Sequence, residues 1–281
     1  MKIRQIRNAT TLIMLGDHCL LVDPMLSDKG SFPGFKFFGG GRRNNPLVEL
    51  PSDAMATMQQ ATGVLITHEH PDHLDVPGIQ WSKSRGLPVW AGELDVPNFR
   101  TKGLDARVIR DGDMQLSVEV IPAQHGHGLL GWMMGPVSGF YLAHPAEPSV
   151  YITGDTILTA QVRDAIERLK PELVIAPAGA ANIGLGRDLL FSVNELVELA
   201  KLAPGNVIFN HLEALDHCPT IRQALRERMD SEGVGDRTFI PADGDWLEFR
   251  RDATKPRISP QASKPRRPGF QKWLTSKMSG T

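Results

Sequence analysis

Three histidines and an aspartate lie within six consecutive positions of the chain, and all four side chains are common metal ligands. They are His68, His70, Asp72 and His73, and they follow the apolar stretch Gly63–Ile66. Neutral imidazole nitrogens and carboxylate oxygens are the ligands that first-row divalent cations prefer. With 9 histidines in 281 residues, composition alone would give an H-x-H-x-x-H pattern in only about one chain in a hundred. The pattern therefore favours a metal site over a solvated histidine-rich loop.

Three more strand-like segments lead to a potential ligand. Val118–Ile121 is followed after three residues by His125, Val150–Gly154 by Asp155, and Val207–Asn210 by His211. Apolar runs bounded by Gly, Pro or Asn are typical of buried strands, and ligand sites of α/β sheets gather at the strands' carboxyl ends. A single residue of this kind is most often a hydrogen-bonded core or turn residue. Four strand ends at one shared sheet edge would bring all of these groups together.

The composition is that of an ordinary soluble globular protein. The residues are 41% hydrophobic and 22% charged, which suits one large domain with a sizeable core. Two cysteines, Cys19 and Cys218, are too few for a disulfide framework, and the N-terminus lacks the apolar region of a signal peptide. No stretch approaches the roughly 18 uncharged apolar residues of a membrane span. We therefore expect a cytoplasmic protein.

The charge is unevenly distributed along the chain. Seven of the 31 Lys and Arg residues lie in 253–281, which holds no acidic residue, so residues 1–252 contain 24 basic and 32 acidic residues. Such an acidic body argues against a nucleic-acid partner. Prolines in the tail disfavour regular structure. We expect one large domain over 1–252 and a basic, Pro-rich tail over 253–281 that is either solvated or packs on its own or a partner subunit in a homo-oligomer.

Helical and strand-like segments alternate along the rest of the chain. A hairpin is predicted over 11–22, helices over 52–61, from 76, over 159–169 and over 193–202, and strands at 88–91 and 173–175. Residues 108–109 and 114–121 are expected to pair antiparallel. The Gly- and Phe-rich residues 25–50 are typical of a long functional loop. Two β-rich stretches with helices outside both predict an α/β (α+β) fold, built as a four-layer αββα sandwich.

These residues resemble the signature of the metallo-β-lactamase superfamily. The resemblance is carried by His68-x-His70-x-Asp72-His73 followed by His125, Asp155 and His211. Asn8–Thr10 and Leu21–Met25 further resemble the branch that contains ascorbate-6-phosphate lactonase-like proteins and N-acyl phosphatidylethanolamine phospholipase D. The resemblance covers residues 1 to about 249. It implies an αββα fold with a two-metal centre in a groove at the edge of the sandwich.

The resemblance also implies which residues bind each metal. It places His68, His70 and His125 on one cation and Asp72, His73 and His211 on a second, with Asp155 bridging the two. A bridging carboxylate holds two cations about 3.5 to 4 Å apart, the separation that two-metal hydrolases use. The expected cofactors are two zinc ions. Manganese and iron also accept histidine and aspartate ligands, so they are alternatives.

Such a centre predicts a hydrolase that acts on a small molecule. Two cations that share a water lower its pKa, and the resulting hydroxide could cleave a lactone, ester or phosphodiester without a Ser or Cys nucleophile. Asp72 could orient this water or accept its proton as the catalytic residue, or it could be a ligand alone. The alternative function is a non-catalytic, metal-containing binding or sensor protein of the same fold.

Five further residues could serve this site. Arg42 could meet an anionic substrate, Trp132 could line its entrance, and His217 could reach it in the pocket. Asp23 and Asp243 could orient metal-bound imidazoles. Each residue has a plainer interpretation, which is solvated charge for Arg42, core packing for Trp132, a surface imidazole for His217 and turn formation for the two aspartates.

Overall fold

The computed structural model describes residues 1–184 and 186–251, and the strands in these ranges form two sheets. The first sheet has seven strands in the order β13-β1-β2-β3-β4-β5-β6, and the second has six in the order β12-β11-β10-β9-β8-β7. The strands of the first sheet are β1 Lys2–Arg7, β2 Thr10–Leu15, β3 His18–Val22, β4 Gly63–Ile66, β5 Pro88–Ala91, β6 Asp105–Val108 and β13 Trp246–Glu248. Those of the second are β7 Ser117–Ala123, β8 Val137–Ala143, β9 Val150–Ile152, β10 Leu173–Pro177, β11 Asn206–Asn210 and β12 Thr238–Phe239.

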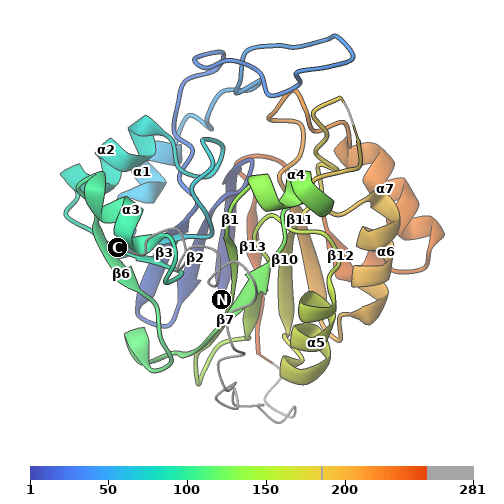
Figure 1. Ribbon diagram of the computed structural model, residues 1–281. Helices are drawn as coiled ribbons and strands as arrows, with labels where there is room; N and C mark the ends of the chain where they lie inside the picture. The colour runs from blue at the N-terminus through green and yellow to red at the C-terminus, as the bar shows by residue number, and fades with distance from the viewer. Residues whose placement is uncertain (185, 252–281) are drawn as a thin grey trace, which may run out of the picture.

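Helices cover the outer face of each sheet (Figure 1). The first sheet is covered by α1 Ala54–Met58, α2 Val76–Ser84 and α3 Val96–Thr101, and the second by α5 Ala160–Leu169, α6 Val193–Leu202 and α7 Arg222–Ser231. The short helix α4 Gly128–Met133 lies at the upper edge of the sandwich in Figure 1. This arrangement is the four-layer αββα sandwich that the sequence predicts.

Alternate side chains of the central strands pack in different layers. In β4, Leu65 packs between the two sheets, whereas Val64 and Ile66 pack beneath α1–α3. In β11, Ile208 packs between the sheets and Phe209 packs beneath the helices of the other side. Successive side chains of a strand point to opposite faces, so both faces of these strands are buried. This burial explains why their sequences are continuous apolar runs without polar alternation.

Most of the predicted elements are present. The predicted hairpin corresponds to β2 and β3, which pair antiparallel. The predicted helix over 193–202 is α6, and Ser192 and Glu195 close its N-terminus with a capping box. The predicted basic tail over 253–281 lies outside the described residues. Across 1–184 and 186–251, none of the helices has the length and apolar character needed to cross a membrane.

The predicted antiparallel pairing of residues 108–109 with 114–121 is wrong. β6 pairs parallel with β5, and β7 pairs antiparallel with β8 in the other sheet. The chain crosses from one sheet to the other between these strands, through Gly112, Met114 and Gln115 with positive φ angles. Two neighbouring β segments that looked like a hairpin therefore belong to different layers.

Arg7, at the end of β1, holds both ends of the long loop over residues 25–50. Its side chain is fully buried, and its guanidinium donates hydrogen bonds to the carbonyls of Met25 at 2.9 Å, Ser27 at 2.7 Å and Val48 at 3.1 Å. Burial lowers the pKa of Arg7, and the carboxylate of Asp75 opposes this shift. The loop is thus fixed to the first sheet through one buried cation.

We expect Arg7→Met to lower the free energy of unfolding by about 3 kcal/mol or more, because three carbonyls lose their donor and each buried unpaired group costs about 1 to 3 kcal/mol. Arg7→Lys keeps the charge but not the planar fork and should recover only part of the loss. Urea unfolding measures both values. As a control, Arg250→Met at a side chain that is 92% exposed should change stability by less than about 0.5 kcal/mol. A similarly small effect of Arg7→Met would contradict the role of Arg7.

Candidate metal centre

The four predicted ligand segments meet where strands of both sheets end. His68 follows β4 in the first sheet, and His125, Asp155 and His211 follow β7, β9 and β11 in the second. β9 and β11 both run parallel to β10. β7 runs in the same direction, because it is antiparallel to β8, which is antiparallel to β9. The groups therefore gather where two stacked sheets meet, rather than at the edge of one shared sheet as the sequence suggests.

Three histidines form the first group of this site. His68, His70 and His125 each present one ring nitrogen, and the three nitrogens lie within 4.8 Å of one another. The His68 Nε2 and His70 Nδ1 atoms are 3.1 Å apart. Burial lowers the pKa of His68 well below its usual value and that of His125 to about 4, with the neighbouring imidazoles adding to both effects. His68 and His125 are therefore neutral near pH 7.

The outer nitrogens of His70 and His125 are bonded to backbone carbonyls. His70 Nε2 lies 2.9 Å from the Met134 carbonyl oxygen, and His125 Nδ1 lies 3.0 Å from that of Leu189. A carbonyl oxygen can only accept, so each of these nitrogens is the one that carries the proton. The inner nitrogens, His70 Nδ1 and His125 Nε2, therefore present lone pairs to the centre of the group.

His68 also has its proton on the outer nitrogen, and the partner of that nitrogen is a hydroxyl group. Its Nδ1 atom lies 3.0 Å from Thr67 Oγ1, and the Thr67 hydroxyl donates its own proton to Asp23 Oδ2 at 2.7 Å. His68 Nδ1 must then be the donor, which leaves a lone pair on Nε2. When both rings are neutral, His68 Nε2 and His70 Nδ1 thus face each other at 3.1 Å with no proton between them. Two lone pairs at this distance repel, and a divalent cation between them converts the repulsion into two bonds, so this group fits a metal ion.

Two aspartates and two histidines form the second group. Asp72, His73, Asp155 and His211 are all buried, and each offers one ligand atom within 4.8 Å of the others. His73 Nε2 lies 3.2 Å from Asp155 Oδ1, and His211 Nε2 lies 3.2 Å from Asp72 Oδ2. Apart from the ion pair that joins them, the buried His73 Nε2 and Asp155 Oδ1 atoms have no hydrogen-bond partner among the described residues. This cluster is also capable of holding a metal ion.

Asp155 lies between the two groups. One carboxylate oxygen, Oδ1, faces His73, while Oδ2 lies 3.3 Å from His125 Nε2 and 3.9 Å from His68 Nε2 in the first group. Oδ2 is also 3.7 Å from His211 Nε2 in the second group. A carboxylate in this position can contribute an oxygen to each of two cations.

The charges in the second group stabilise one another. Burial raises the pKa of Asp72 and Asp155, but the neighbouring imidazoles, His73 and His211, outweigh it and lower both values. Burial lowers the pKa of His73, yet Asp155 and Asp23 raise it to about 10. Without a metal ion, the two carboxylates are ionised and protonated imidazoles provide the balancing charge. Cations and protons therefore compete for the same nitrogens.

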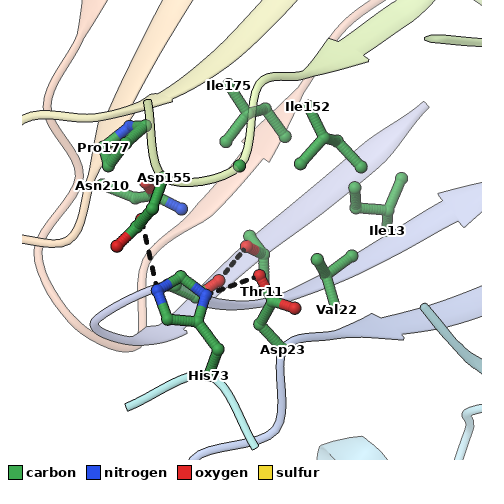
Figure 2. Close-up of a pocket in the computed structure, with 12 residues that line it drawn as sticks. Thr11, Ile13, Val22, Asp23, His73, Ile152, Asp155, Ile175, Pro177 and Asn210 are labelled. Carbon is green, nitrogen blue, oxygen red and sulfur yellow. Dashed lines mark hydrogen bonds and ion pairs between the residues drawn. The ribbon is translucent and has the colours of Figure 1, made fainter. Parts of the chain in front are cut away.

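Asp23 holds His73 and the residue that precedes His68. Its Oδ2 accepts hydrogen bonds from His73 Nδ1 at 2.8 Å and Thr67 Oγ1 at 2.7 Å, and its Oδ1 accepts one from the Thr67 backbone N–H at 2.8 Å. Figure 2 shows His73 between Asp23 on one side and Asp155 on the other. The contact of Asp23 with an imidazole that the sequence predicts is thus present, and it turns His73 Nε2 toward the centre.

Asp243 does not contact an imidazole, so its predicted role in orienting one is wrong. Its Oδ1 accepts a hydrogen bond from Arg222 Nη2 at 2.6 Å. The carboxylate is mostly buried, and the cation that compensates its charge is this guanidinium. An aspartate near the end of a strand does not indicate by itself whether an imidazole or a guanidinium will be its partner.

The three predicted substrate residues have different surroundings. The guanidinium of Arg42 is held within its own loop, 2.8 Å from the Gly34 carbonyl oxygen and stacked 5.0 Å above the Phe37 ring. Trp132 is 60% exposed on α4, so its interpretation as a core residue is wrong. His217 is only 7% exposed, so it is not a surface imidazole. Their contact with a substrate stays a prediction.

Three further residues, which the sequence patterns above do not predict as part of the site, contact the ligand segments. Thr67 bonds His68, Cys218 Sγ lies 3.5 Å from His211 Nδ1, and Asn8 Nδ2 donates to the backbone carbonyl of Asp72 at 3.0 Å. Thr67 has a local signal, since it directly precedes His68 at a strand end. Asn8 is 64 residues from Asp72 in the chain, so no local pattern connects the two.

Comparisons with known proteins identify relatives of this chain. A family model described as a beta-lactamase superfamily domain matches residues 18–212. The UPF0173 protein YddR of Bacillus subtilis is 28% identical and matches 89% of this chain and 100% of that protein. A UPF0173 metal-dependent hydrolase of Cereibacter sphaeroides is 30% identical over 64% of this chain and 74% of its own length. A mitochondrial N-acyl-phosphatidylethanolamine-hydrolyzing phospholipase D of Saccharomyces cerevisiae is 25% identical, over 57% of this chain and 36% of that protein.

The structure is also similar to that of a characterised hydrolase. The crystal structure of an isothiocyanate hydrolase from Delia radicum gut bacteria superposes with a TM-score of 0.80 at 29% sequence identity. The match covers 89% of this chain and 100% of that one.

We expect Asp23→Asn to weaken Zn²⁺ binding by about 10- to 100-fold, the usual cost of losing a group that orients a ligand. The amide offers one acceptor oxygen to three donors, so His73 and Thr67 cannot both stay in place. Competition with a chromophoric chelator measures the affinity. Asp243→Asn is the matched control, because Arg222 is its partner, and it should bind Zn²⁺ like the parent. Equal affinity in Asp23→Asn and the parent would argue against this role of Asp23.

Proposed function

Because this chain belongs to the metallo-β-lactamase superfamily and is a metal-dependent hydrolase of the UPF0173 type, we propose that it hydrolyses a small electrophilic molecule with two divalent cations. In this proposal His68, His70 and His125 bind the first cation, Asp72, His73 and His211 bind the second, and Asp155 bridges them. Each of these seven side chains offers one ligand atom to the two groups described above.

One observation carries this proposal. His68 Nε2 and His70 Nδ1 face each other at 3.1 Å while the outer nitrogens of both rings are donors to other groups. A hydrogen bond between two neutral rings would need a proton that neither ring has available at these atoms. The nitrogen and oxygen donors suit Zn²⁺, and they also suit Mn²⁺ and Fe²⁺.

The side chains divide the work at this site. Two cations bound here would lower the pKa of a shared water toward neutrality and polarise the substrate oxygen. Asp72 Oδ2 engages His211, so we assign the water to the other oxygen of this carboxylate. Its neighbours keep Asp72 ionised against the effect of burial, so this oxygen is available to accept a hydrogen bond from that water. In this proposal Asp72 orients the water and takes its proton for the leaving group. No Ser or Cys nucleophile is needed.

The charges around the site favour an uncharged substrate. The charged partners of Asp72 and Asp155 within 4.0 Å are all histidines, and no Lys or Arg pairs with either carboxylate in the described part of the chain. Sites for phosphodiesters usually add arginine or lysine side chains as clamps. A lactone or an ester therefore fits better than a phosphodiester. The similarity to an isothiocyanate hydrolase adds isothiocyanates, whose central carbon is also an uncharged electrophile.

The metal content tests the assignment of ligands. The parent protein, loaded with Zn²⁺ and dialysed, should contain about two ions per chain by elemental analysis. His68→Ala with His70→Ala should remove two of the ligands of one cation and leave about one ion. His18→Ala, at the far end of β3, is the control and should keep the parent's content. An unchanged content in the double variant would refute the assignment.

Turnover tests the proposed chemistry. Metal-loaded parent should hydrolyse at least one member of a panel of lactones, esters, isothiocyanates and phosphodiesters, and a chelator should abolish this activity until metal is restored. Asp72→Asn should lower kcat by about 10²- to 10⁴-fold, the typical contribution of a proton-transferring group. If the parent contains two ions but is inactive across the panel, a binding or sensor protein is the better description and the proposed hydrolysis is wrong.

A further inference from the structure

Asn8 lies in the tight connection between β1 and β2, at the same edge of the sandwich as the metal centre. Its side chain is fully buried, and its φ angle is +56°. Non-glycine residues rarely adopt this left-handed conformation, and asparagine is one of the few that tolerate it. The mechanism proposed above assigns no role to this residue.

Asn8 contacts the backbone of two proposed ligands. Its side-chain Nδ2 donates a hydrogen bond to the carbonyl oxygen of Asp72 at 3.0 Å, and its own carbonyl accepts one from the backbone N–H of His211, also at 3.0 Å. Asp72 and His211 are 139 residues apart in the chain. Both are proposed ligands of the second cation, so one residue connects the two segments that hold it.

The position of Asn8 is itself fixed. Gln5 Nε2 donates to the carbonyl oxygen of Asn8 at 2.7 Å, so this oxygen receives two hydrogen bonds. Gln5 belongs to β1, which pairs with β2 and β13. The connection between β1 and β2 is therefore held in the first sheet, and it holds in turn the segments that follow β4 and β11, which carry Asp72 and His211.

His211 depends on this backbone contact more than the other histidines do. The outer nitrogens of His68, His70, His73 and His125 each have an oxygen partner within 3.0 Å. The outer nitrogen of His211 has the Cys218 sulfur at 3.5 Å instead, and sulfur is a weak acceptor. His211 also has a positive φ of 58°. The orientation of the His211 ring thus depends less on its side-chain partner Cys218 and more on the backbone hydrogen bond to Asn8.

We propose that Asn8 is a positioning residue that sets the separation of Asp72 and His211 and thereby the affinity of the second cation. This inference rests on the proposed two-cation function. Asn8 acts only through the two ligands, since its contacts are with their backbones. The first cation, whose ligands Asn8 does not contact, keeps its affinity when Asn8 is changed.

Two substitutions separate the side chain of Asn8 from its backbone. Asn8→Gly tolerates the positive φ and keeps the carbonyl that binds His211, but it lacks the donor to Asp72. Asn8→Asp keeps the shape and places a carboxylate oxygen against the Asp72 carbonyl. We expect a 10- to 100-fold loss of affinity for the second Zn²⁺ in Asn8→Gly, roughly the cost of losing a group that orients a ligand, and a larger loss in Asn8→Asp.

Elemental analysis at a series of buffered free Zn²⁺ concentrations measures this effect without an activity assay. Asn8→Gly should contain one ion per chain at concentrations where the parent contains two, and excess Zn²⁺ should restore the second. Phe99→Leu is the control, because Phe99 is buried under the first sheet, away from the site. It should lower the melting temperature and leave both ions bound.

Three results would overturn the proposal. The first is a parent-like second affinity in Asn8→Gly. The second is an equal loss of both ions in Asn8→Gly, or a similar loss in Phe99→Leu, because either would indicate a general effect of stability. The third is a parent protein that itself binds fewer than two ions. The third result would also refute the proposed function, whereas the first two leave that function intact.

Discussion

Buried carboxylates and inward-facing imidazole nitrogens require positive charge between them, and the architecture around the site follows from this requirement. Two aspartates and five histidines meet in a small space that is largely closed to water. With neutral rings, the three histidines of the first group cannot hydrogen-bond one another through their inner nitrogens, because the outer nitrogens carry the protons. The second group can do so only with protonated imidazoles. Placing such groups together is costly unless cations bind there.

The folding of the sandwich reduces this cost before any cation arrives. The strands are buried on both faces, so their ends have little freedom, and each ligand follows within a few residues of such an end. Oxygen partners then fix four of the five histidine rings. Two of these partners are the carbonyls of Met134 and Leu189, and both residues pack in the same apolar cluster as Phe32 and Phe35 of the long loop. The long loop is thus packed against the residues whose carbonyls bond two of the histidines.

Much of this arrangement could be predicted from the sequence, and the reasons are physical. Apolar runs such as 63–66 and 207–209 show buried strands, and ligand chemistry at their ends shows a site. The family resemblance then supplied the pairing of ligands. The pairing partners of individual strands are harder to predict. Residues 108–121 have the pattern of a hairpin, and nothing in the local sequence shows that the chain crosses from one sheet to the other there. The contact of Asp23 with an imidazole was predictable from its place at a strand end, but the same logic failed for Asp243, whose partner is Arg222.

Contacts between distant segments were outside the reach of sequence patterns. Asn8 has no feature that connects it to Asp72 or His211, because the connection exists only after both sheets have formed. The burial of His217 is a similar case, since its ring packs edge-on against Phe35 from the long loop. Local sequence determines which groups are available, and the tertiary fold determines which of them meet.

Anomalous X-ray diffraction from crystals of the Zn²⁺-loaded protein tests the central claim most directly. The account predicts two zinc peaks about 3.5 to 4 Å apart, one bound by His68, His70 and His125 and the other by Asp72, His73 and His211, with Asp155 contacting both. A site with no zinc peak, or with a single ion that leaves the inner nitrogens of one group unbound, would contradict it.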